Sequence, residues 1–170
     1  MGSVTLTHVI GTAGLMIVFF AVGSYYSISY TSLQLQIIAV NLEKTSDYVA
    51  SNVMDMISLC YMSEANQVIF KKLEIPARIG TYSYNVTILH MTEEENFKVR
   101  AYLVSRPTTY GESTLPWSTS GIMKIYNGTD IGIENLSFDP KISVVSGSSN
   151  IVVWCLKLEN EIIIGLGIMK

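Results

Sequence analysis

The sequence predicts an α+β protein in which a long N-terminal hydrophobic helix precedes an antiparallel β-sandwich head domain. Hydrophobic residues make up 49% of the 170-residue chain and charged residues only 15%. All 11 Lys and Arg residues and all 14 Asp and Glu residues lie at or after Glu43. After Ala65 the apolar pattern changes from helical spacing to alternation. The chain therefore has an uncharged, apolar first part and a second part that contains all of the charged residues.

The first predicted element is a membrane-length helix within residues 1–31. Residues 9–28 are apolar and uncharged, and about 20 such residues span the hydrocarbon core of a bilayer. Tyr25, Tyr26 and Tyr30 lie at the end of this stretch, where aromatic rings favour the boundary between lipid and water. The residues expected to face lipid, or the core of a filament, are Ile10, Leu15, Ile17, Phe20, Val22 and Ile28.

The helix is expected to continue through residues 32–65 as an amphipathic stalk. The chain has neither Gly nor Pro between Ser24 and Ile75, so nothing there breaks a helix. An apolar stripe runs along this segment through Leu35, Ile38, Leu42, Val49, Val53 and Met56. The stripe needs a partner, which is either the chain's own C-terminal domain, neighbouring copies of the chain, or both.

Residues 66–170 are predicted to form the β head. In residues 82–88 apolar and polar side chains alternate, so Asn85 is expected on the solvated face. Residues 105–121 contain Pro, Gly, Ser and Thr and predict a long exposed loop. Apolar side chains on both faces of the last strand predict that it is central or covered by the helix. The seven predicted strands are residues 68–73, 82–89, 97–104, 122–126, 142–145, 151–158 and 162–168.

The sequence offers no catalytic or metal-binding pattern, so we expect no enzyme and no cofactor. The two histidines are His8, inside the apolar segment, and His90, at a strand end. GxSxG and Gly-rich phosphate-binding motifs are absent. The acidic run at residues 93–95 is expected at a solvated turn. A formal net charge of −3 excludes the basic surface that nucleic-acid binding requires.

Two features predict an exterior location for the head. Asn-x-Ser/Thr sequons begin at Asn85, Asn127 and Asn135, and each is a candidate glycosylation site. Cys60 and Cys155 are the only cysteines, and they are either a disulfide or two buried thiols.

In its layout the chain resembles archaeal type IV pilin-like proteins, the pilus and archaellum families of the class III signal peptide superfamily. The resemblance is carried by the uncharged helix that includes HVIGTAGLMIVFF and by the segment LEIPARIGTYSYNVTIL. It implies a structural subunit that resides in the membrane before assembly and then packs with copies of itself in a cell-surface filament. The helices would form the core of the filament and glycosylated heads its surface.

Two alternatives remain open from the sequence. The chain is also similar to the stator-like accessory proteins of the archaellum, whose membrane-anchored β-sandwich domain binds a partner in the cell envelope. A third interpretation is a small sensor or binding module that captures a ligand with its head loops.

Overall fold

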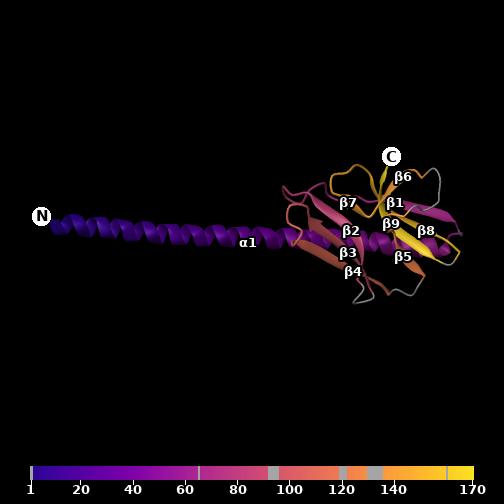
Figure 1. Ribbon diagram of the computed structural model, residues 1–170, viewed down its shortest axis with the longest axis horizontal. Coiled ribbons are helices and arrows are strands. Elements are labelled where there is room, and N and C mark those ends of the chain that lie inside the picture. Colours follow the sequence, from indigo (N-terminus) through magenta and orange to yellow (C-terminus); the bar gives the residue numbers. More distant parts are fainter. Residues whose placement is uncertain (1, 65, 92–95, 119–121, 130–135, 160) are drawn as a thin grey trace. The chain divides into compact units, whose positions relative to one another are not determined.

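The computed structural model describes residues 2–64, 66–91, 96–118, 122–129, 136–159 and 161–170. The chain is α+β, with one long helix followed by nine strands in the described residues (Figure 1). It divides into two compact units, Met1–Ile37 and Ile38–Lys170.

Helix α1 covers Gly2–Met62, in agreement with the absence of breaking residues in the second half of that range. Its final turn has no basic side chain of its own. Instead, Lys157 donates hydrogen bonds from Nζ to the carbonyl oxygens of Tyr61, at 2.8 Å, and Ser63, at 2.6 Å. A cation at this end satisfies free carbonyl groups and complements the helix dipole.

The strands of the second unit form two sheets. The five-stranded sheet has the order β1-β8-β9-β5, and β6 also pairs with β9. Its strands are β1 (Gln67–Lys72), β5 (Met123–Ile125), β6 (Phe138–Lys141), β8 (Ile151–Lys157) and β9 (Ile162–Met169). The four-stranded sheet has the order β4-β3-β2-β7. Its strands are β2 (Tyr84–Met91), β3 (Asn96–Leu103), β4 (Tyr110–Ser118) and β7 (Ser143–Val145).

Three features differ from the sequence-based expectation. Residues 110–118, predicted as loop, form the edge strand β4, and an edge position beside a register shift tolerates Pro116. Strand β6 was not predicted. The head is also not purely antiparallel, because β5 runs parallel to β9. The seven predicted strands are all present, with ends that differ by at most two residues.

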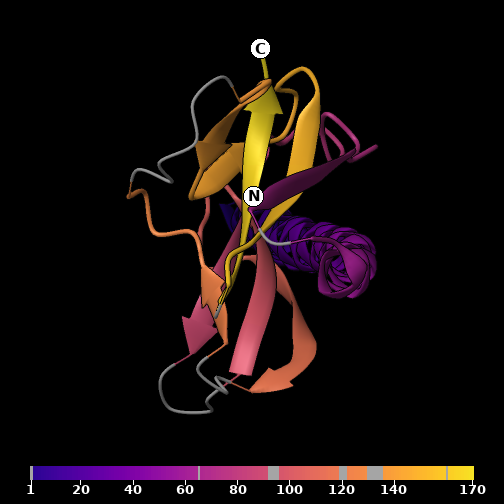
Figure 2. The same ribbon diagram turned by 90° about the vertical axis from the view of Figure 1, so that its right-hand side faces the viewer.

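The main core of the second unit joins α1 to both sheets, and Figure 2 shows the last turns of the helix beside the strands. Its members include Leu42 and Val53 from α1, Val99 from β3, and Val153 and Ile164 from the other sheet. A smaller cluster on the opposite face of β8 surrounds the fully buried Trp154. Strand β9 is therefore central in its sheet, as its two apolar faces predicted.

Gly165 on β9 is required by the packing of Trp154. A Cβ atom at Gly165 would lie 2.6 Å from a ring carbon of Trp154, which is too close for any side chain. The same tryptophan donates a hydrogen bond from Nε1 to the carbonyl oxygen of Leu166, at 2.8 Å. The indole ring is thus held by close packing against Gly165 and by a hydrogen bond to the backbone of Leu166.

Candidate membrane and assembly helix

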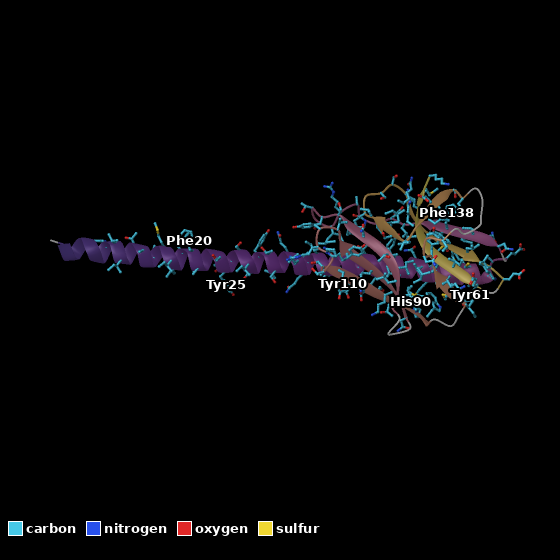
Figure 3. The ribbon with its side chains drawn as sticks, in the orientation of Figure 1. Phe20, Tyr25, Tyr61, His90, Tyr110 and Phe138 are labelled. Carbon is cyan, nitrogen blue, oxygen red and sulfur yellow. The ribbon has the colours of Figure 1, made fainter. Side chains whose placement is uncertain are left out.

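The first unit presents an uncharged apolar surface on all sides of α1. Leu15, Ile17 and Phe20 are 71%, 69% and 72% exposed. Figure 3 shows Phe20 and Tyr25 projecting from this part of the helix. The other predicted core positions, Ile10, Val22 and Ile28, are likewise exposed. Such a surface in water would be strongly unfavourable, so it requires a non-aqueous environment or partner helices.

In the described part of the chain, α1 is the one helix long and apolar enough to cross a membrane. Its mean hydropathy over the qualifying window is 1.7, and none of that window is buried. These are the properties of a membrane anchor or a signal segment.

Two polar side chains of this unit form hydrogen bonds with the backbone of the helix itself. The Thr12 hydroxyl donates to the carbonyl oxygen of His8 at 2.6 Å, and that of Thr31 donates to Ser27 at 2.9 Å. Hydroxyl groups bonded to the preceding turn carry no unsatisfied donor into an apolar environment.

The glycines of the first unit leave its surface open to another helix. At Gly11, Gly14 and Gly23, an added Cβ would have no atom within 4 Å. A shallow depression at Gly23 is flanked by Phe19, Phe20 and Ile28. Small residues beside large apolar ones allow the backbones of neighbouring helices to approach closely.

From Ile38 onward the predicted apolar stripe is covered by the strands of the chain's own head. Ile38, Leu42, Val49, Val53 and Met56 are all buried in the main core. Leu35, which belongs to the first unit, is partly exposed. The sequence left two partners open for this stripe, the chain's own C-terminal domain and neighbouring copies. From Ile38 onward, the partner is the chain's own C-terminal domain.

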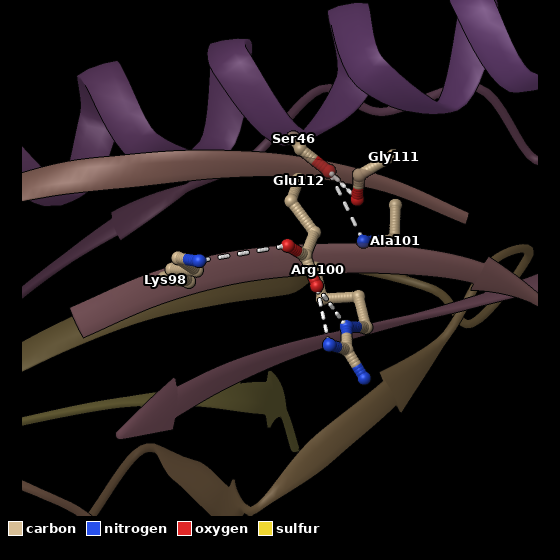
Figure 4. Close-up of polar contacts among 6 residues, drawn as sticks. All are labelled: Ser46, Lys98, Arg100, Ala101, Gly111 and Glu112. Atoms are coloured by element: carbon tan, nitrogen blue, oxygen red, sulfur yellow. Dashed lines mark hydrogen bonds and ion pairs between the residues drawn. The ribbon is translucent and has the colours of Figure 1, made fainter. Parts of the chain in front are cut away.

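Ser46 fixes the helix to the four-stranded sheet (Figure 4). Its buried hydroxyl donates to the carbonyl oxygen of Gly111 at 2.9 Å and accepts from the backbone N–H of Ala101 at 3.0 Å. Ala101 and Gly111 face one another on β3 and β4. One side chain therefore bridges α1 and two strands.

Gly111 allows this contact because it has no side chain. A Cβ atom there would lie 2.1 Å from the backbone nitrogen of Glu43, so the helix and β4 meet backbone to backbone. Neither Ser46 nor Gly111 was predicted as a contact residue. Gly111 lies in the segment predicted as an exposed loop, and no local pattern marks Ser46.

On the other face of the same sheet, the carboxylate of Glu112 on β4 pairs with two basic side chains of β3. It forms ion pairs with Arg100 and, at 3.9 Å, with Lys98 (Figure 4). The guanidinium of Arg100 also lies 4.9 Å from the ring centre of Tyr110. These contacts hold the edge strand β4 in its register.

Cys60 and Cys155 are brought together from the last turn of α1 and from β8. Both are fully buried as free thiols. Burial raises the pKa of the Cys155 thiol well above its usual value, and a hydrogen bond with Cys60 raises it further. The two thiols are therefore adjacent, and the Cys155 thiol stays protonated at neutral pH.

The sequons occupy different environments. Asn127 is exposed, and its Oδ1 accepts hydrogen bonds from the backbone N–H of Thr129, at 3.1 Å, and from the Thr129 hydroxyl, at 2.7 Å. Asn85 is half-buried on β2 and its Nδ2 donates to the Tyr102 hydroxyl at 3.2 Å, while its Oδ1 is buried without a partner. The solvated position expected for Asn85 is thus only partly realised. Asn135 lies outside the described residues.

The two histidines and Asp139 belong to different parts of the chain. His90 packs against Phe97, with ring centres 5.4 Å apart, and His8 belongs to the first unit. Asp139 lies in β6 and pairs with Lys141 at 2.7 Å. Within the described ranges, no three His, Cys, Asp or Glu residues are placed to hold a metal ion. The acidic run at residues 93–95 lies outside those ranges.

Exposed large apolar side chains are concentrated in the first unit. In comparisons with known proteins, no protein-family model, no curated protein and no solved structure matches the chain. The exposed surface of α1 before Ile38 is therefore the candidate functional surface of the described residues.

Proposed function

We propose that the chain is a structural subunit of an extracellular type IV pilus-like filament. The N-terminal helices would pack together as the core, and the β heads would form the outer surface. A single observation carries the proposal: the uncharged, exposed apolar surface of α1 ends where residues of the same helix become part of the head's core. The proposed role is structural rather than catalytic.

The division of α1 supports assembly through its first unit. The stripe from Ile38 onward is occupied by the head and is not free for neighbouring copies. Contacts between subunits would therefore use residues such as Ile17, Phe20 and the open glycines. Because lipid and apolar helices are alike in hydrophobicity, transfer from membrane to filament would depend on close packing.

An exterior location of the head is part of the proposal. The exposed sequon at Asn127 suits a secreted protein, and an oxidising compartment would allow the adjacent thiols of Cys60 and Cys155 to form a disulfide. We also interpret the two sheets as the layers of a β-sandwich, because side chains from both line one core.

The second candidate is a membrane-anchored, stator-like accessory protein whose head binds the cell envelope. It is favoured by the coverage of the stalk stripe, since an anchored head needs no free stripe. The two functions differ in self-assembly. Purified full-length protein should form ordered helical polymers if it is a filament subunit and discrete small oligomers if it is an accessory protein, as electron microscopy would show.

A further inference from the structure

A cavity of about 370 Å³ lies within the second unit, between α1 and the segment that joins β1 to β2. Asn41, Lys44 and Tyr48 line it from the helix, and Glu74, Arg78 and Ile79 line it from the segment. Its volume lies within the range of small-molecule sites in proteins.

Hydrogen bonds hold the backbone of the segment that lines this cavity. The Tyr48 hydroxyl accepts a hydrogen bond from the backbone N–H of Glu74 at 3.3 Å. Further along the segment, the buried Tyr84 donates from its hydroxyl to the carbonyl oxygen of Pro76 at 2.6 Å. Ile79 then exchanges two backbone hydrogen bonds with Tyr82, at 3.0 and 3.1 Å. A backbone held in this way loses little conformational entropy when the site binds a ligand.

The charged residues that line the cavity carry a net positive charge. Lys44 and Arg78 have no ion pair with any described residue, whereas Lys71, Arg100 and Lys124 each have an acidic partner. Glu74 is the one acidic residue in the lining, so the cavity carries an excess of one positive charge. This excess stands out in a chain with a net charge of −3.

We propose that this cavity binds a small organic anion through a carboxylate or phosphate group. The planar guanidinium of Arg78 would take two oxygens of such a group, and Lys44 would add a second positive charge. The amide of Asn41 supplies a further hydrogen-bond donor, and Ile79 an apolar wall for the uncharged part of the ligand. The site goes beyond the filament role, because that role is proposed for the first unit and this cavity lies in the second.

The test is an NMR titration of the ¹⁵N-labelled full chain in nonionic detergent. Inorganic phosphate and glucuronate are the two anionic probes, which distinguish phosphate from carboxylate recognition, and glucose is the uncharged control. We expect saturable shifts at residues 41–48 and 74–80 with at least one anion and none with glucose. The affinity should fall with added salt, because the attraction is electrostatic.

Variants separate the site from general charge effects. Arg78→Gln and Lys44→Gln should each weaken binding by about tenfold, because each removes a charged hydrogen-bonding partner. Arg106→Gln removes a cation without an ion pair among the described residues and outside this lining, and should leave the affinity unchanged. Unshifted resonances elsewhere would verify that each variant folds.

The proposal is overturned if neither anion gives saturable shifts in the wild type. Equal weakening by Arg106→Gln would also overturn it, because binding would then reflect overall charge. Filament formation is not part of this measurement, so failure of the anion site and failure of the proposed function are distinguishable.

Discussion

At the scale of single residues, Ser46 carries the most specific contact between helix and sheet. Ser46→Ala would leave the N–H of Ala101 and the carbonyl of Gly111 without this partner in a buried site. We expect a loss of about 1–3 kcal/mol in the free energy of unfolding. Urea denaturation of the full chain in detergent measures it. The control is Ser58→Ala, because the exposed Ser58 hydroxyl bonds only to the carbonyl of Met54 in its own helix; equal losses in the two variants would contradict the assignment.

Tyr84 should make the head sensitive to alkali. Burial raises the pKa of Tyr84 from 10.0 to about 12, a shift that a hydrogen bond with Thr45 partly opposes. A pKa higher in the folded than in the unfolded state contributes stability that is complete below pH 10 and is lost as the pH rises towards 12. Stability of the wild type should therefore fall across this window.

Tyr84→Phe tests this prediction, because it removes the ionisable hydroxyl while retaining the buried ring. Its baseline stability should be lower, since the hydrogen bond to Pro76 is lost. Its free energy of unfolding should nevertheless decline less steeply between pH 10 and 12, as followed by circular dichroism. Identical slopes for the two proteins would show that other groups determine the alkaline transition.

The sequons should differ in their modification. Asn127 is exposed in a turn, whereas Asn85 is half-buried in the sheet with its amide bonded to Tyr102. We expect sugar on Asn127 and an unmodified Asn85 in protein isolated from its native cells. Glycopeptide mass spectrometry decides the matter, and a glycan on Asn85 alone would reverse the expectation.

At the scale of elements, the contact between α1 and β4 depends on Gly111. Gly111→Ala would place a methyl group against the backbone of Glu43, which no side-chain movement can relieve. We expect a greater loss of stability than for Ser46→Ala, on the order of 3 kcal/mol or more. Gly14→Ala, where the added Cβ meets nothing within 4 Å, is the control and should leave the melting of the head unchanged. Similar melting of the two variants would contradict the backbone contact.

The same region shows what the sequence could and could not predict. Strands with strict alternation, such as β3, were identified because one face is buried and the other half-exposed. Strand β4 was missed because Gly111 and Pro116 are typical of loops. Its formation depends on pairing with β3 and on close contact with α1, which are long-range interactions that a local pattern does not contain. Local pattern likewise identified the apolar helix surface, but not Ser46.

The first unit of α1 should tolerate no charge. Ile17→Asp or Phe20→Asp is expected to cost about 2.5–3.5 kcal/mol at the middle of a bilayer and to abolish assembly. Val104→Asp makes the same kind of change at a half-exposed position of the head and should affect neither property. Membrane fractionation and electron microscopy of the three variants measure insertion and assembly. Normal filaments from Phe20→Asp would exclude this surface from the core.

At the scale of the whole molecule, each part of the chain has a distinct role in the proposed function. In the second unit, the apolar stripe of α1 is buried in one core that the helix shares with both sheets. The first unit leaves its apolar surface uncovered. The head buries its own apolar side chains, whereas the first part of α1 leaves its apolar side chains exposed. We expect this arrangement of a subunit that assembles through its helix.

The most direct test of this account is electron cryomicroscopy of full-length protein purified from its native membrane and released from detergent. The account predicts ordered helical polymers in which residues 8–37 of neighbouring copies pack together in the core and the β heads lie outside. A discrete dimer under every condition, together with cellular filaments unaffected by deletion of the gene, would contradict it.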